Sequence, residues 1–339
     1  MTATTMASSA HALVASGKGI LAADESFPTI EKRFKALNVP STEENRRAYR
    51  ELLFATPGLG EFISGTILFD ETIHQKTGGN SMPEALARFG IIPGIKVDGG
   101  TMGLPGFTGE NITQGLDGLR EKLAAYRELG ARFTKWRAVI SIGARLPTAT
   151  CIEANARALA LFAALSQEAG LVPIVEPEVV MDGDHSLARC EEITHMTLES
   201  VFGVLFEHRV VLEHMLLKTG MVLPGEDCRQ QAEVGEIAEA TLRCLRRAVP
   251  AAVPGIVFLS GGQSDVAATE RLNAICAAGG APWTLTFSFG RALQDTALKI
   301  WKGSPANVVA AQAALLHRAK CNGLAVQGKY SADVERATV

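Results

Sequence analysis

Eight apolar runs rich in β-branched residues recur along the chain at intervals of roughly 30–45 residues, about the length of one strand–helix unit. They lie at residues 18–25, 62–69, 91–98, 132–140, 171–179, 210–218, 255–262 and 283–290. The segments between them carry helical spacing, and two of these, 236–250 and 270–280, end in proline or glycine, as helices often do. The pattern predicts strands that alternate with helices in a parallel sheet.

Eight such units close naturally into a (β/α)8 barrel, the TIM barrel of the α/β class. An open, doubly wound sheet is the alternative. It would want a glycine-rich fingerprint after the first strand, whereas the first run ends in Asp24-Glu25-Ser26. No linker divides the chain, so we expect a single barrel domain over residues 1–339, with flexible termini at 1–9 and about 326–339.

The charge and residue spacing disfavour several classes of partner. The net charge is −3 and no basic block exceeds a pair, so we expect neither nucleic acid nor a membrane surface as partner. No apolar run reaches the roughly 18 residues of a membrane span, and no secretory signal precedes the six scattered cysteines. We therefore expect a reduced, cytoplasmic protein. The histidines have no HExxH-like spacing, which argues against a catalytic metal.

Polar residues cluster where the predicted strands end, and the active site of a barrel lies at those carboxyl ends. Side chains alternate along a strand, so residues two apart share a face. The pairs are Lys96 with Asp98, Lys135 with Arg137, and Glu176 with Glu178. Apolar helices cover the outer face of a barrel, where a charge would need a partner, so we expect these charges to face inward.

Lys218 ends the otherwise apolar run VVLEHMLLK. On a face shared with Leu216 and Leu212, it is predicted to emerge from the barrel core into a site that holds other lysines. Burial and like charge there lower its pKa from about 10.4 towards neutrality. A neutral amine attacks carbonyls to form a Schiff base, which permits cleavage of an adjacent carbon–carbon bond. A structural lysine paired with a carboxylate is the alternative.

Two further features fit this chemistry. Glu176 and Glu178 are candidates for the general acid and base that imine formation requires, with structural ion pairs to the basic residues of the fourth run as the alternative. Ser260-Gly261 and Gly290-Arg291 follow the seventh and eighth runs, where barrels commonly bind phosphate. Glycines let backbone N–H groups approach an oxyanion, and arginine offers a bidentate fork. Together they indicate a phosphorylated substrate.

The motifs KGILAADES, GIKVD, FTKWR, VPIVEPE, LLKTGMV, FLSGGQS and FSFGRAL follow one another across about residues 18–330. In this order they resemble the class I, Schiff-base-forming fructose-1,6-bisphosphate aldolases, and the short tail suits a bacterial or other non-animal member. The resemblance implies reversible cleavage of fructose 1,6-bisphosphate to dihydroxyacetone phosphate and glyceraldehyde 3-phosphate in glycolysis and gluconeogenesis. It also implies no metal or other cofactor, and a homo-oligomer that is commonly a tetramer.

Position by position, the resemblance assigns a role to each site residue. Lys218 would form the imine, Glu176 would be the main acid and base for carbinolamine dehydration, and Asp24 would assist cleavage of the C3–C4 bond. Lys135 would polarise the substrate, and Glu178 would hold the charge network. The matches to the phosphate pocket of the dihydroxyacetone half are Ser260, Gly261, Gly290 and Arg291. The matches on the aldehyde half are Ser26, Lys96 and Arg137, with Lys32 and Arg33 nearby.

Two departures from the family pattern bear on function. Phe27-Pro28-Thr29 stands where animal members carry Thr-Gly-Ser, which predicts a second phosphate site of altered shape or strength. The tail ends shortly after Tyr330 and lacks the terminal tyrosine linked to proton exchange on the enamine. Another group, such as Glu176, is expected to take over that exchange, or the step is slower.

Three alternatives to this function stand beside it. The same chemistry on sedoheptulose 1,7-bisphosphate or fructose 1-phosphate is the nearest. A metal-dependent barrel lyase is the second. The third is a non-catalytic scaffold that binds other proteins, which the chain disfavours because Lys218, Glu176, Asp24, Lys135 and Arg291 are all present.

Overall fold

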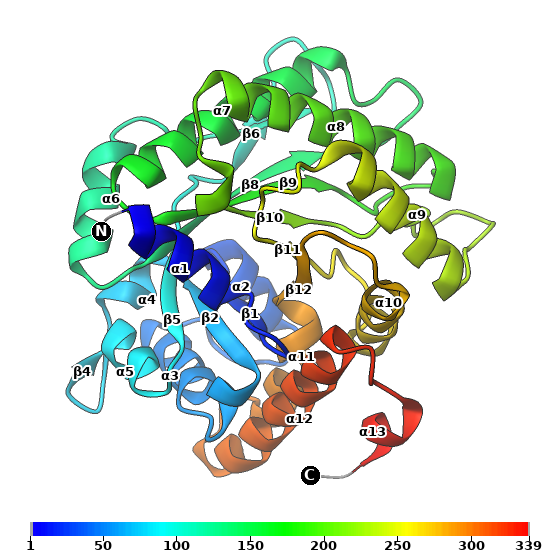
Figure 1. Ribbon diagram of the computed structural model, residues 1–339. Helices are drawn as coiled ribbons and strands as arrows, with labels where there is room; N and C mark the ends of the chain where they lie inside the picture. Colours follow the sequence, from blue (N-terminus) through cyan, green and yellow to red (C-terminus); the bar gives the residue numbers. More distant parts are fainter. Residues whose placement is uncertain (1–2, 338–339) are drawn as a thin grey trace.

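The computed structural model describes residues 3–337, in which eight parallel strands form a closed barrel surrounded by helices (Figure 1). Their order around the barrel is β1-β12-β11-β10-β9-β8-β5-β2. The strands are β1 (Gly19–Ala23), β2 (Ile63–Leu68), β5 (Ile92–Lys96), β8 (Phe133–Ile140), β9 (Val172–Val179), β10 (Leu216–Thr219), β11 (Gly255–Phe258) and β12 (Thr284–Phe289). Each falls within or overlaps one predicted run, so the predicted (β/α)8 barrel is confirmed.

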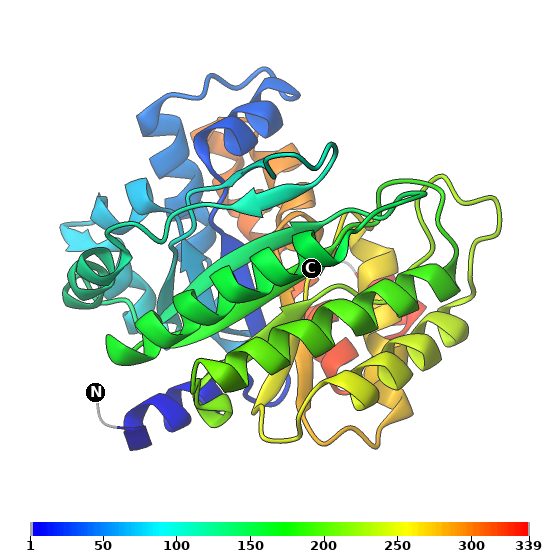
Figure 2. The same ribbon diagram turned by 90° about the horizontal axis from the view of Figure 1, so that it is seen from above.

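Helices connect the strands and cover the barrel. They are α1 (Ala3–Leu13), α2 (Phe27–Lys35), α3 (Glu43–Phe54), α4 (Asp70–His74), α5 (Met82–Arg88), α6 (Leu119–Glu128), α7 (Ala149–Glu168), α8 (Leu187–Glu207), α9 (Val234–Ala248), α10 (Asp265–Ala278), α11 (Arg291–Trp301), α12 (Val308–Val326) and α13 (Ala332–Arg336). Short 3-10 turns are η1 (Leu59–Glu61), η2 (Leu212–His214) and η3 (Pro305–Asn307). The view from above shows α7 and α8 side by side along one flank (Figure 2).

Two small antiparallel hairpins lie outside the barrel. One pairs β3 (Lys76–Thr77) with β4 (Asn80–Ser81), and the other pairs β6 (Thr101–Gly103) with β7 (Asn111–Thr113). The second hairpin follows β5, and its residue Thr101 reaches the cavity described below.

Local sequence explains where several helices begin. A serine or threonine precedes each of these helices, and its hydroxyl accepts a hydrogen bond from a backbone N–H in the first turn that has no partner within the helix. These residues are Thr42 before α3, Ser81 before α5, Thr148 before α7, Ser186 before α8 and Ser264 before α10. The caps therefore help to fix where these helices begin.

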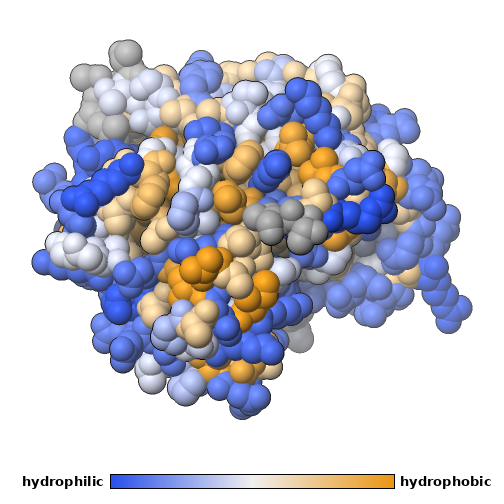
Figure 3. All heavy atoms as spheres, turned by 90° about the horizontal axis from the view of Figure 1, so that it is seen from below, coloured by the Kyte–Doolittle hydropathy of each residue, from blue (hydrophilic) through white to orange (hydrophobic). Residues whose placement is uncertain are grey.

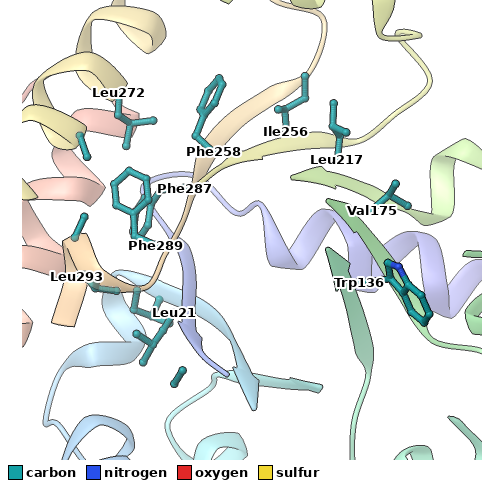
Figure 4. Packing of buried hydrophobic residues seen from close by; sticks show 14 of the residues in the cluster. Leu21, Trp136, Val175, Leu217, Ile256, Phe258, Leu272, Phe287, Phe289 and Leu293 are labelled. Carbon is teal, nitrogen blue, oxygen red and sulfur yellow. The ribbon is translucent and has the colours of Figure 1, made fainter. Parts of the chain in front are cut away.

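Buried strand residues divide between two apolar clusters because side chains alternate along a strand. One cluster lies between barrel and helices and contains Leu21, Trp136, Val175, Leu217, Ile256, Phe258, Phe287 and Phe289 (Figure 4). The other cluster fills the barrel and contains Ile67, Phe133, Val172, Ile174, Leu216 and Val257. Residues two positions beyond the inner cluster on β8, β9 and β10 therefore also face inward.

The sixth predicted strand is the one that differs most from the structure. Residues 212–214 form η2, and β10 begins only at Leu216. Lys218 does share the inner face with Leu216, but Leu212 packs against the outer cluster, so the prediction of a common face is wrong for Leu212. An apolar run alone does not distinguish a buried strand from a buried turn.

Both ends of the chain hold helices. Met6, Ala10 and Leu13 of α1 pack with the inner cluster at the amino end of the barrel. In α13, Glu335 pairs with Arg318 and accepts a hydrogen bond at 2.7 Å from the Tyr330 hydroxyl. The flexibility expected for residues 1–9 and about 326–339 stays a prediction, and residues 1–2 and 338–339 lie outside the described part of the chain.

The face seen from below mixes hydrophilic side chains with smaller apolar patches (Figure 3). Among the helices between residues 3 and 337, none combines the length and the apolar character needed to cross a membrane.

Candidate active site

A cavity of about 700 Å³ opens at the carboxyl ends of the barrel strands, and residues on or directly after each of the eight strands line it. Parallel strands bring these ends to one rim, so residues far apart in sequence meet there. All predicted site residues except Lys32 line this cavity. They are Asp24, Ser26, Arg33, Lys96, Lys135, Arg137, Glu176, Glu178, Lys218, Ser260, Gly261, Gly290 and Arg291.

Lys32 is exposed on α2, whereas the next residue, Arg33, faces the cavity. Adjacent residues point in different directions around a helix, so only one of the two reaches the rim. Arg33 itself pairs with Glu25 and, at 2.9 Å, with Asp295. Its charge is thus already balanced by two carboxylates.

The floor of the cavity holds a compact network of buried charges. The Lys218 Nζ atom lies 3.1 Å from Glu176 Oε1 on the adjacent strand. The Lys135 Nζ atom lies 2.6 Å from Asp24 Oδ2, 3.5 Å from Glu176 Oε2 and 4.0 Å from Asp98 Oδ2. Glu176 therefore sits between two ammonium groups. Within residues 3–337, Lys135 has three carboxylate neighbours, whereas Lys218 has a single one.

These contacts decide the charge of two groups. Burial disfavours the ionised form of Asp24, but Lys135, Lys218 and Lys96 together outweigh it and lower the pKa of this carboxyl below its ordinary value. Burial likewise disfavours the charged form of Lys135, but Asp24, Glu176 and Asp98 outweigh it and raise the pKa of its ammonium group well above its ordinary value. At neutral pH, Asp24 is a carboxylate and Lys135 is a cation.

A second pair of contacts lies along β5, β8 and β9. Lys96 Nζ is 2.5 Å from Asp98 Oδ1 and donates to the Asp98 backbone carbonyl at 2.8 Å. Arg137 donates from Nε to Glu178. Glu176 pairs with Lys135 and Glu178 pairs with Arg137, and all four residues line the cavity. The two glutamates therefore form the structural ion pairs considered as the alternative and also belong to the site.

The ends of β11 and β12 form a region suited to an oxyanion. Gly261 has a φ of +55°, a conformation that glycine adopts without strain. Gly290 precedes α11, whose first backbone N–H groups lack helical acceptors, and a Cβ there would lie 3.4 Å from the Ala22 carbonyl oxygen. Arg291 has no ion-pair partner within residues 3–337, and the buried Ser288 hydroxyl has no hydrogen-bond partner there.

The structure adds lining residues that were not predicted as site residues. Asp98 and Ser288 carried a signal in the sequence, because each lies two residues from a predicted site residue on the same strand or just beyond its end. Phe69 carried none, because it follows β2 and only the closed barrel brings it to the same rim as the other site residues.

Comparison with known proteins gives a consistent result. Residues 5–339 match the family described as fructose-bisphosphate aldolase class-I. A probable fructose-bisphosphate aldolase class 1 from Xanthomonas campestris pv. campestris is 57% identical over 96% of this chain and 98% of its own length. The cytosolic fructose-bisphosphate aldolase 4 of Arabidopsis thaliana is 52% identical over 94% of this chain and 82% of its own.

A solved structure agrees as well. Fructose-bisphosphate aldolase from Plasmodium falciparum, in a ternary complex with TRAP and a small-molecule inhibitor, superposes with a TM-score of 0.95. It is 49% identical in sequence, and the match covers 96% of this chain and 95% of that one.

Proposed function

The chain belongs to the class-I fructose-bisphosphate aldolase family, lyases that act through a lysine Schiff base, and from this premise we propose which residues perform each step. The substrate is fructose 1,6-bisphosphate, which is cleaved reversibly to dihydroxyacetone phosphate and glyceraldehyde 3-phosphate. The observation that carries the assignment is the Lys218 amino group, buried on the cavity floor and 3.1 Å from Glu176.

Lys218 is the nucleophile. The other ammonium group on the floor, Lys135, is held in its charged form by three carboxylates and has no lone pair to offer. Lys218 has one carboxylate contact, and once its proton has passed to Glu176 or solvent, the neutral amine attacks the C2 carbonyl. The product is a carbinolamine on Lys218.

Glu176 then acts as acid and base for dehydration. Its Oε1 atom faces Lys218, and its buried Oε2 atom has no hydrogen-bond partner within residues 3–337. A proton delivered from Glu176 to the carbinolamine hydroxyl releases water and leaves a protonated imine. Lys135, 3.5 Å from Glu176 Oε2, stabilises the carboxylate that remains.

Asp24 takes the proton from the C4 hydroxyl, because its lowered pKa keeps it ionised at neutral pH. The C3–C4 bond breaks, its electron pair moves to the imine to form an enamine, and the aldehyde leaves. Protonation of the enamine at C3 and hydrolysis of the imine release dihydroxyacetone phosphate. Tyr330 does not line the cavity, so we assign the C3 proton to Glu176.

Two regions of the rim hold the substrate ends. Gly261, Gly290 and Arg291 bind the phosphate of the dihydroxyacetone half, since glycine N–H groups, a helix N-terminus and an unpaired guanidinium converge there. Lys96 and Arg137, on the other side of Lys218, reach the phosphate of the aldehyde half. We extend the proposal to cytoplasmic function in glycolysis and gluconeogenesis and to a homotetramer.

Borohydride trapping tests the reaction class and the nucleophile together. The protein is incubated with dihydroxyacetone phosphate, reduced and digested, and the added mass is located by mass spectrometry. Label on the peptide that carries Lys218 is the expected result. No label, together with activity lost in excess EDTA, would mean a metal-dependent reaction, and no label without activity would point to a scaffold.

Relative kcat/KM values for fructose 1,6-bisphosphate, sedoheptulose 1,7-bisphosphate and fructose 1-phosphate test the substrate. A large preference for the monophosphate would contradict the proposed second phosphate site.

A further inference from the structure

The segment Ser26-Phe27-Pro28-Thr29 joins β1 to α2 at the cavity rim. Ser26, Pro28 and Thr29 line the cavity, whereas Phe27 does not and is 47% exposed. Half-exposed apolar side chains are common on protein surfaces, so the contacts of the Phe27 ring decide whether it has a role.

The Phe27 ring contacts Phe69 and Arg46, and we call these three residues the clamp. The Phe27 ring meets the Phe69 ring edge to face, with centroids 5.2 Å apart, and the Arg46 guanidinium carbon lies 4.8 Å from the Phe27 ring centroid. Arg46 is fixed in turn, because its Nε donates to Glu71 at 2.8 Å and its Nη1 donates to the Ser41 carbonyl at 2.5 Å. The ring thus ties the segment after β1 to elements that follow β2 and to α3.

The opposite side of this segment presents hydroxyl groups. The Ser26 and Thr29 hydroxyls are joined by a hydrogen bond of 3.1 Å, and the Ser26 hydroxyl does not cap α2. Pro28 restricts the backbone φ within the first helical turn, so the segment has little freedom before a ligand arrives. One of these hydroxyls donates to the other, so the pair on this stiff turn presents one remaining O–H donor to an anionic oxygen at the rim.

The position of the clamp relates these hydroxyls to one end of the substrate. In the barrel, β1 is next to β2 and β2 is next to β5, which ends in Lys96. Phe69 follows β2 and lines the cavity between Ser26 and Lys96. Arg291, at the other phosphate region, follows β12 on the opposite side of β1. The clamped segment is therefore aligned with the Lys96 side of the rim.

We propose that Phe27 is a positioning residue for this enzyme: through Phe69 and Arg46 it holds the Ser26 and Thr29 hydroxyls on the Lys96 side of the rim, and it thereby sets the preference for substrates with a phosphate on the aldehyde half. The inference rests on the aldolase function and on the substrate ends proposed above. It makes Phe27 a determinant of specificity that touches neither substrate nor reacting atoms.

The test compares two substrates that differ only in that phosphate. Wild type, Phe27→Ala and the conservative Phe27→Tyr are assayed with fructose 1,6-bisphosphate and fructose 1-phosphate. For Phe27→Ala we expect kcat/KM for the bisphosphate to fall about tenfold, mainly through KM, because the hydroxyls are no longer held in place. Turnover of the monophosphate should change less than twofold, and Phe27→Tyr should retain the wild-type ratio.

Phe89→Ala is the matched control, since Phe89 is similarly exposed at 42% and, like Phe27, does not line the cavity. If Phe27→Ala folds poorly, Phe27→Leu keeps apolar bulk without a ring face and should show the same split to a smaller degree. Equal losses on both substrates, or no loss on the bisphosphate, would overturn the clamp. Wild type that neither cleaves sugar nor labels with dihydroxyacetone phosphate would overturn the aldolase function itself, and this inference with it.

Discussion

The two ends of the barrel are built from the same eight strands, but the amino end is packed with apolar side chains and the carboxyl end holds buried charges. At the amino end, Met6, Ala10 and Leu13 of α1 pack against apolar strand residues and fill the opening. At the carboxyl end, the same strands present Lys135, Glu176 and Lys218, which are buried but charged. On one strand, an apolar core residue is therefore followed two positions later by a charged residue of the cavity, as Leu216 is by Lys218.

The contrast shows where each end obtains its stability. The amino end gains from apolar burial and close fit: Gly65 and Gly255 have no side chains, and a Cβ at either would lie 2.6 Å from Leu13 or Val14. The carboxyl end carries charges whose burial is costly and is offset only by their mutual pairing. Changes at the amino end should reduce stability without altering chemistry, whereas changes at the carboxyl end should alter chemistry and, where they leave a buried charge without its partner, also reduce stability.

Lys218→Ala should give the largest effect. No other amine can form the imine at this position, so activity should fall below about one hundredth of wild type while the protein stays folded. Steady-state cleavage assays and circular dichroism measure the two properties. Lys320→Ala, which removes an exposed lysine from α12, is the control. Residual activity above that level would contradict Lys218 as nucleophile.

Leu13→Ala tests the amino end. Leu13 is fully buried in the inner cluster, so we expect the free energy of unfolding to fall by about 2–5 kcal/mol. The kcat of the folded enzyme at 25 °C should stay near wild type. Urea unfolding and activity assays check both, with Leu161→Ala, 42% exposed on α7, as the control. A large drop in kcat would show that the two ends are coupled.

Arg291→Ala tests the region after β12. Removing a charge-assisted phosphate contact should cost about 1.5–3 kcal/mol, seen mainly as a higher KM. The kcat should change little, because Arg291 is not part of the charged floor. A saturation curve in fructose 1,6-bisphosphate measures this. An unchanged KM would place the phosphate elsewhere.

The pH dependence of Asp24 should give the smallest effect. Its pKa is lower in the folded protein than in the unfolded chain, so its ionised form stabilises the fold above the unfolded pKa of about 3.9. This stabilisation is lost as the pH falls through the lower, folded pKa. The difference in unfolding free energy between wild type and Asp24→Asn should be constant from about pH 7 to 5 and shrink below about pH 4. A difference that grows on acidification would reverse the sign of the shift.

Much of the fold and site was predictable because the signals are local or periodic. Strand and helix alternation predicted the barrel, and inward-facing residues such as Lys135 and Glu176 followed from alternation along each strand. The expectation failed for Leu212, where apolar character did not distinguish a turn from a strand. It also did not include Phe69, which reaches the site only through closure of the barrel.

The sequence by itself determined the fold and the family, and it indicated the residues that we propose as reacting groups, because residue type and spacing are properties of the chain. Tertiary structure alone decided that, within residues 3–337, the Lys135 ammonium group has three carboxylate neighbours and the Lys218 ammonium group has one. Coulomb interactions depend on the distances between strands, which the sequence does not give. Tertiary structure likewise decided that the Phe27 ring meets the Phe69 ring edge to face and that its centroid lies 4.8 Å from the Arg46 guanidinium carbon. Lys135 and Lys218 look alike in the sequence, and only their surroundings in the barrel distinguish a fixed cation from the nucleophile that we propose.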